Sequence, residues 1–295
     1  MQLTASEVAR FHDDGYLVVE GVLGPDVLGP LIADFDELVA DIARTLVADG
    51  RLDDEYAGLP FERRLAVLTW AAGESLQRRV SFPANHRRAM FEFLTSPLLL
   101  DLIESLVGPE IYCHPTQHVR PKLPEFVGEQ FRDFSFQSPV HQDAAALLPE
   151  ADETFVLTSW IPLVDVTEDM GPVEVYPGLH RGPIRRHHYV PGLGLTIAQN
   201  QLPETEPVPI PVAKGDVLLI HCRMPHRSRT NVTPIVRWSV DLRWNDARQP
   251  SGRPLPGLVV RSRERALTAY AEWIRAWADV ERNRVPHVVD RWRSS

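Results

Sequence analysis

The feature that most constrains the fold of this chain is a change of hydrophobic period near residue 111. Before it, apolar side chains recur every three or four residues, as on one face of an amphipathic helix. After it, they come in short runs separated by glycine and proline, which predicts β-strands. In the clearest run, 236–244, apolar and polar side chains alternate, so one face of that strand packs and the other is polar. The other runs lie at 111–119, 154–164, 173–176 and 217–220.

The order of these patterns predicts a single domain of residues 1–295, because no repeat, low-complexity tract or linker-like change of composition divides the chain. We expect a mainly helical part (1–110), a β core (111–250) and a C-terminal helix (262–295). The fold class is therefore mainly β with flanking helices. The aromatic face of the last helix suits either the core or a subunit contact, which leaves a homodimer open.

Helix start and stop signals are clearest at the N-terminus. Thr4 and Glu7 form a capping box, so a short helix is expected from there to Gly15, followed by a strand at 16–19. Further helical periods lie at 26–46, 61–72 and 87–106, the last interrupted by a proline.

Two segments have more than one interpretation. Residues 183–214 are rich in proline and glycine without a clear period, and are long enough to form an active-site lid. The basic group at 78–88 is able to hold an anionic substrate, although such charge runs are usually solvated faces. Its members are Arg78, Arg79, His86, Arg87 and Arg88.

Composition excludes several classes of function. Lys and Arg number 31 against 40 Asp and Glu, a formal charge of −9, so nucleic acid and anionic membranes are not expected partners. Cys113 and Cys222 are far apart and give no disulfide framework, which favours a reducing compartment. With no signal-peptide pattern and no apolar run of about 18 residues, we expect a cytoplasmic protein without membrane spans.

A metal site is predicted around His141 and Asp143. On an extended backbone, residues two apart leave the same face of a strand, so these two side chains can converge on one ion. Two histidines compete for the third place: His221, directly after an apolar strand, and His226, past a proline in the following turn. With His226 the set is a two-histidine, one-carboxylate triad, which binds Fe(II) and leaves positions open.

Arg237 suggests what those positions hold. It lies eleven residues after His226, on the polar face of the 236–244 strand. Iron-bound 2-oxoglutarate needs a cation for its distal carboxylate, and a guanidinium pairs with a carboxylate through two hydrogen bonds.

Four ordered segments resemble a known family. They are 3–18, Pro139–Asp143, Gly171–His180, and His226–Asn231 followed by Arg237. Together they resemble the phytanoyl-CoA dioxygenase family of Fe(II)- and 2-oxoglutarate-dependent oxygenases, over most of the chain. Leu179 departs from the small hydroxyl residue usual in the third segment. The resemblance implies a double-stranded β-helix, a cupin-like jelly roll with the metal in its mouth.

The resemblance also implies cosubstrate contacts. Lys122, Trp160 and Ser228 would join Arg237 around 2-oxoglutarate. Trp160 is equally expected as a core residue, and Ser228 as a turn hydroxyl. His180 is expected to be structural, and the pair His187 and His188 to lie at the surface.

The implied reaction uses Fe(II), 2-oxoglutarate and dioxygen to oxidise a small molecule, and releases succinate and CO2. In halogenating relatives a small residue replaces the carboxylate ligand, so the acid at Asp143 favours hydroxylation or another oxidation. Desaturation, epoxidation and epimerisation stay open. Two other classes also stay open: an iron enzyme that does not use 2-oxoglutarate, and a non-catalytic cupin-like binding protein.

The alternation of side chains along the strand that contains Lys122 predicts substrate contacts. If Lys122 faces inward and the strand is not bulged at Pro121, then Thr116, His118 and Arg120 point the same way. Gln137 lies just before the proximal motif, so we expect the substrate at His118 and Gln137. Because the motifs carry no dense basic cluster, a small metabolite or natural product is favoured over a CoA ester.

Overall fold

The alternating run at 236–244 forms the longest strand of the larger sheet, β12 (Arg237–Asp246). The computed structural model describes residues 1–131, 138–191, 193–286 and 291–292. Trp238, Val240, Leu242 and Trp244 on one face of β12 are completely buried, and Phe35 and Phe61 stack on Trp238 with ring centroids 6.4 and 4.5 Å away. This face therefore attaches the helices to the sheet.

The larger sheet is antiparallel and has the order β1-β10-β5-β12-β2-β13, with β3 also paired to β12. Its other strands are β1 (Tyr16–Val19), β2 (Ile111–Cys113), β3 (His118–Lys122), β5 (Leu157–Pro162), β10 (Val217–His221) and β13 (Leu258–Arg261). Both β2 and β3 lie along the same edge of β12, one after the other.

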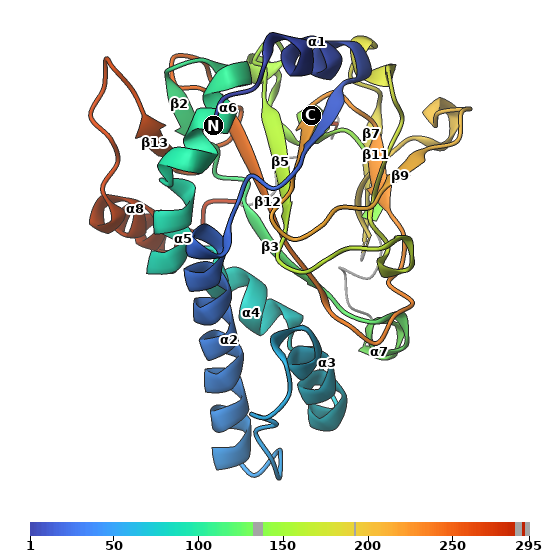
Figure 1. Cartoon of the computed structure of the whole chain (residues 1–295), viewed down its shortest axis with the longest axis vertical. Helices are drawn as coiled ribbons and strands as arrows, with labels where there is room; N and C mark the ends of the chain where they lie inside the picture. Colours follow the sequence, from blue (N-terminus) through green and yellow to red (C-terminus); the bar gives the residue numbers. More distant parts are fainter. Residues whose placement is uncertain (132–137, 192, 287–290, 293–295) are drawn as a thin grey trace.

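A smaller antiparallel sheet lies opposite, in the order β4-β11-β6-β9, and a hairpin of β7 and β8 accompanies it (Figure 1). The strands are β4 (Ser138–His141), β6 (Val173–Val175), β7 (His187–Val190), β8 (Gly194–Ile197), β9 (Val208–Ile210) and β11 (His226–Ser228). The two sheets form the expected cupin-like jelly roll.

Most helices cover the larger sheet on the side away from the smaller one (Figure 1). They are α1 (Ala5–Asp14), α2 (Pro25–Ala48), α3 (Phe61–Ala72), α4 (Gln77–Ala84), α5 (Arg88–Leu94), α6 (Pro97–Val107), α7 (Glu125–Phe131) and α8 (Tyr270–Asn283). The capping box of α1 is present, since Thr4 N donates to Glu7 Oε2 at 2.7 Å and Glu7 N to Thr4 Oγ1 at 3.3 Å. Gly15 ends the helix in the left-handed conformation.

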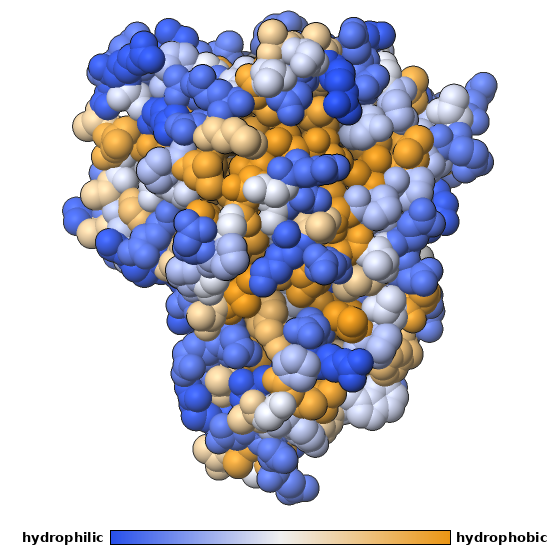
Figure 2. Space-filling view, in the orientation of Figure 1, coloured by the Kyte–Doolittle hydropathy of each residue, from blue (hydrophilic) through white to orange (hydrophobic). Residues whose placement is uncertain are grey.

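The surface follows this arrangement. Figure 2 shows hydrophobic side chains gathered in the middle of the visible face, where the strands lie in Figure 1, and hydrophilic side chains around them. Among the described helices, none is both long and apolar enough to cross a membrane.

The structure corrects or adds to three sequence expectations. The run at 111–119 is two strands, because the chain leaves the sheet after His114, whose N–H still donates to Arg243 O at 2.8 Å, and rejoins it at β3. The segment 183–214, which shows no clear period in the sequence, contains the β7–β8 hairpin and β9. The last helix begins at Tyr270, not at residue 262, because Thr268 is tied back to β13 by its N–H to Val259 O at 2.9 Å.

Gly171 offers a test of how tightly the segment before β6 packs against the segment after β11, its neighbour in the smaller sheet. It has a φ of 62°, and an added Cβ would overlap the carbonyl oxygens of Arg229 and Thr230. Gly178 has a φ of 78°, but nothing lies within 4 Å of its Cβ position. Left-handed strain alone costs about 1–2 kcal/mol, so Gly178→Ala should lose about that much free energy of unfolding.

We expect Gly171→Ala to lose clearly more, because the backbone must also move. Urea unfolding of the two variants measures the difference. Equal losses of unfolding free energy in the two variants would show that the backbone after β11 moves aside without destabilising the protein.

Candidate active site

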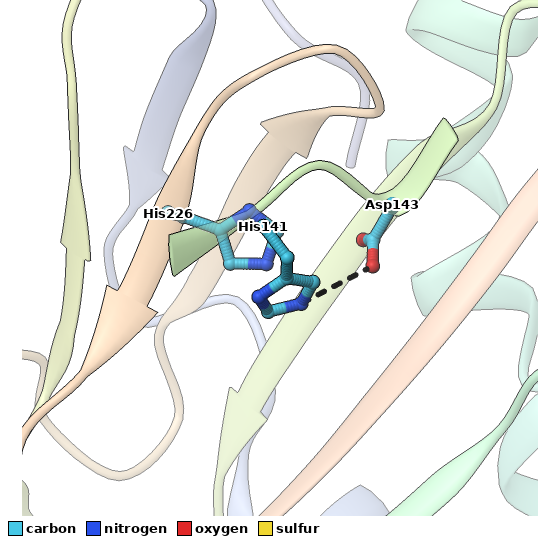
Figure 3. A group of neighbouring side chains, drawn as sticks. All are labelled: His141, Asp143 and His226. Atoms are coloured by element: carbon cyan, nitrogen blue, oxygen red, sulfur yellow. Dashed lines mark ion pairs between the residues drawn. The ribbon is translucent and has the colours of Figure 1, made fainter. Parts of the chain in front are cut away.

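Strand pairing brings the first two predicted ligands together. His141 ends β4 and His226 begins β11, and these residues are register partners on adjacent antiparallel strands. Their rings lie on the same face with centroids 4.2 Å apart. Asp143 follows at the start of a 3-10 turn, and its Oδ1 is 3.8 Å from His141 Nε2 (Figure 3). One possible ligand atom from each of the three lies within 4.8 Å of the others.

The competing histidine lies elsewhere. The His221 ring packs 5.2 Å from the ring of His180 and 5.2 Å from that of Phe155. The structure therefore groups His226, and not His221, with His141 and Asp143.

Backbone carbonyls orient both histidine rings of the triad. His141 Nδ1 lies 2.8 Å from Pro139 O, and His226 Nδ1 lies 3.0 Å from Met224 O. A carbonyl only accepts, so each Nδ1 carries the proton and each Nε2 keeps a lone pair for a metal. Burial, together with His226, lowers the pKa of His141 to about 3, which keeps this ring neutral at pH 7.

Both oxygens of Asp143 are already hydrogen-bonded. Thr158 Oγ1 donates to Oδ2 at 2.5 Å, and Arg243 Nη2 donates to Oδ1 at 2.8 Å. Burial alone would raise the pKa of this carboxyl, but Arg243 and the two histidines hold it well below its usual range. Thr158 and Arg243 thus fix the plane of an ionised carboxylate. The sequence alone suggested no role for Thr158 or Arg243, although Arg243 lies on the polar face of the same strand as Arg237.

A second part of the site contains two buried cations side by side. Lys122 and Arg237 are register partners on β3 and β12, and each is 2% exposed. Lys122 Nζ donates to Ser228 Oγ at 2.7 Å and to Arg229 O. Arg237 Nη1 donates to Gly171 O at 2.7 Å, and its guanidinium carbon lies 5.1 Å from the centre of the Trp160 ring.

These two cations lack an anionic partner. Within the described residues no acid forms an ion pair with Lys122 or Arg237, and Arg237 Nε is buried without any hydrogen bond. Glu174, the buried acid nearby, pairs instead with Arg227 at 2.5 Å and Arg229 at 2.6 Å. Burial and the neighbouring Arg120 lower the pKa of Arg237 to about 9, and burial and Arg237 lower that of Lys122. Such an environment favours a bound anion.

A cavity of about 320 Å³ joins the two parts. Its lining contains the triad, all four predicted cosubstrate residues, and three side chains in β3 and just before it. These are His141, Asp143, His226, Lys122, Trp160, Ser228, Arg237, Thr116, His118 and Arg120. The proposed substrate residue Gln137 lies outside the described residues.

Other predicted side chains lie away from the cavity. His187 is buried and not at the surface, because its Nε2 accepts from Gln142 N at 3.0 Å and so supports the loop between the ligands. His180 is structural as expected, with Nε2 3.0 Å from His12 O. None of the basic group at 78–88 lines the cavity, and within it Arg87 pairs with Asp34 at 2.5 Å.

Comparison with known proteins connects this geometry to a family. A family model described as phytanoyl-CoA dioxygenase (PhyH) matches residues 11–239. A 1-deoxypentalenic acid 11-beta-hydroxylase of Streptomyces arenae is 30% identical over 258 residues, which cover 82% of this chain and 82% of that protein.

Two solved structures share the fold. The non-heme monooxygenase ThoJ has a TM-score of 0.63 at 18% identity, covering 93% of this chain and 96% of its own. EctD from S. alaskensis, solved with 2-oxoglutarate and 5-hydroxyectoine, has a TM-score of 0.60 at 22% identity, covering 92% and 86%. Because the family model matches most of this chain, the chain belongs to the phytanoyl-CoA dioxygenase family of Fe(II)- and 2-oxoglutarate-dependent oxygenases.

Proposed function

We propose that this protein oxidises a small metabolite or natural product, by hydroxylation, at a site built from His141, Asp143 and His226. The observation that carries the proposal is the pair of buried cations, Lys122 and Arg237. They face the same cavity as the triad, and no acid among the described residues forms an ion pair with either. A dicarboxylate cosubstrate supplies the missing negative charge.

The donor set fits Fe(II). Two imidazole nitrogens and one carboxylate oxygen are the ligands of iron oxygenases that keep other coordination positions open. Iron and 2-oxoglutarate, when bound, supply the activation of dioxygen, and the cosubstrate leaves as succinate and CO2. The protein's contribution is to orient these groups and to keep the cavity dry.

Each cosubstrate residue has a distinct part in the proposal. Arg237 would pair with the distal carboxylate of 2-oxoglutarate through its Nε and the guanidinium edge next to it. Lys122, held by Ser228, would add a second positive charge close to that carboxylate. Trp160 covers the guanidinium and excludes water from it.

Asp143 and its partners bear on the reaction type. An acid in this place fills the position that a halide would need, which disfavours halogenation. The names of the Streptomyces arenae hydroxylase and of the monooxygenase ThoJ, and the 5-hydroxyectoine bound to EctD, support hydroxylation as the first candidate.

The third ligand is testable by a matched pair of variants. His226→Ala should lose most of its affinity for Fe(II), because it removes one of three ligands, whereas His221→Ala should bind metal as the wild type does. Anaerobic calorimetric titration with Fe(II) measures both. Loss of binding in His221→Ala with retention in His226→Ala would reverse the assignment.

The cation site is testable by the weak visible charge-transfer band of the Fe(II)–2-oxoglutarate complex. We expect Arg237→Ala to weaken 2-oxoglutarate binding on the order of 100-fold, as expected for the loss of a buried, charge-assisted pair. Arg44→Ala, on the exposed side of α2, serves as the control. An unchanged band titration in Arg237→Ala would disprove the role of this residue.

The hydrogen bond that supports Asp143 is testable with two variants of neighbouring residues on β5. Thr158→Val removes the hydrogen bond to Asp143 Oδ2, and loss of such a ligand support typically weakens metal binding about 10–100-fold. The neighbouring Ser159 is also buried but accepts from Trp244 Nε1 at 2.8 Å, on the other face of β5. Ser159→Ala should therefore reduce stability without reducing Fe(II) affinity, and equal affinity losses would contradict a specific role for Thr158.

A further inference from the structure

Beyond the triad and the two buried cations, a third group of polar and charged side chains lines the cavity. We call His118, Arg120, Asp241 and Arg243 the polar corner. They come from β3 and β12, where His118 is the register partner of Asp241 and Arg120 that of Ser239. All four line the cavity.

The polar corner carries more positive than negative charge. Asp241 Oδ2 accepts from Arg120 Nε at 3.0 Å and lies 3.4 Å from Arg243 Nη2. Arg243 also donates to Asp143, so two guanidinium groups share two carboxylates. Under the proposed function, however, the charge of Asp143 is given to iron. Asp241 is then the one acid left between two arginines among the described residues of the corner.

His118 is held in one tautomer. Its Nδ1 lies 3.3 Å from Arg120 Nη2 and 3.2 Å from Arg243 Nη1, and a guanidinium only donates. Nδ1 therefore accepts, and the ring proton is on Nε2. Asp241 Oδ1, at 3.4 Å from Nδ1, makes no hydrogen bond, which agrees with this tautomer. Burial and Arg120 lower the pKa of His118, so the ring is neutral.

Two donors of the corner are consequently left for a ligand. Within the described part of the chain, neither His118 Nε2 nor Arg120 Nη1 has an acceptor. Both side chains are partly open, with relative exposures of 41% and 37%.

The opposite wall is apolar. Tyr189 and Leu193 of the β7–β8 hairpin line the cavity and are 49% and 38% exposed, so their apolar surface is accessible to a ligand. Leu195 continues this wall, and Ala146 also lines the cavity. A ligand in this space meets donors on one side and hydrocarbon on the other.

We propose that the substrate is a carboxylic acid with an apolar body, its carboxylate bound by the Arg120 guanidinium and His118 Nε2–H, and its body against Tyr189, Leu193 and Leu195. This inference rests on the proposed function. A carboxylate accepts at both oxygens and suits two convergent donors, one of them charged. A cationic substrate would find only Asp241, which already pairs with two arginines.

The test uses three probes of one shape: adamantane-1-carboxylate, adamantane-1-carboxamide and 1-adamantylamine. Each is titrated anaerobically by calorimetry into the full chain loaded with Fe(II) and 2-oxoglutarate. We expect the carboxylate to bind at least about tenfold more tightly than the amide, the effect of about 1.4 kcal/mol, and the amine to bind least. Equal affinities of acid and amide, no binding of either, or tightest binding of the amine would overturn the inference.

Two variants test which residues bind the carboxylate and the apolar body of the probe. Arg120→Gln should remove the preference for acid over amide, and Leu193→Ala should weaken both probes alike. If Arg120→Gln does not fold, Arg120→Lys, which keeps the charge but not the fork of donors, should reduce the preference without abolishing it. A preference unchanged in the folded variant would overturn the assignment to Arg120.

The charge-transfer band of the Fe(II)–2-oxoglutarate complex distinguishes failure of the substrate assignment from failure of the proposed function. A wild-type protein that forms the band but shows no preference for the acid refutes only the substrate class. A wild-type protein that does not form the band refutes the proposed function itself.

Discussion

The structure depends on a row of charged side chains that β12 turns away from the helices. Arg237, Asp241 and Arg243 are between 2% and 6% exposed, and burial of charge is costly unless each group is paired. The surrounding elements therefore have to supply partners. Gly171 O meets Arg237, while Asp143 and Asp241 meet Arg243. The opposite face of the strand, with its buried tryptophans, provides the hydrophobic attachment that keeps this row in place.

The two arginines at either end of that row differ in how their charge is balanced. Arg243 contacts two acids of the protein, Asp143 and Asp241, and so serves to fix a carboxylate. Among the described residues, Arg237 contacts a carbonyl and an aromatic face but no acid, so its charge is left for a ligand. Chemically identical side chains six residues apart on one strand thus have different roles, and the position of the acids decides which is which. This division is the physical basis of the proposed cosubstrate site.

Much of this could be predicted from sequence, because alternation specifies the face of a strand directly. It predicted the polar face of β12 and, given Lys122 inward, the inward direction of His118 and Arg120. Alternation does not specify register, which is why Arg243 was not connected to Asp143, 100 residues away. His187 was misjudged for a related reason. Its burial results from a tertiary contact with Gln142 N, and no local pattern encodes that contact.

The register of β3 and β12 also sets the distance between the predicted cosubstrate residues and the predicted substrate residues. Lys122 pairs with Arg237 at one end of the β3–β12 ladder, and His118 pairs with Asp241 four residues further along. At about 3.4 Å per residue, the two ends are about 14 Å apart. The metal triad lines the same cavity, and its Asp143 is held by Arg243 of β12, so one pair of strands would position both the cosubstrate and the substrate near the iron. A slip by one residue would turn both sets of side chains toward the helices, so stability of the core and geometry of the reaction depend on the same pairing.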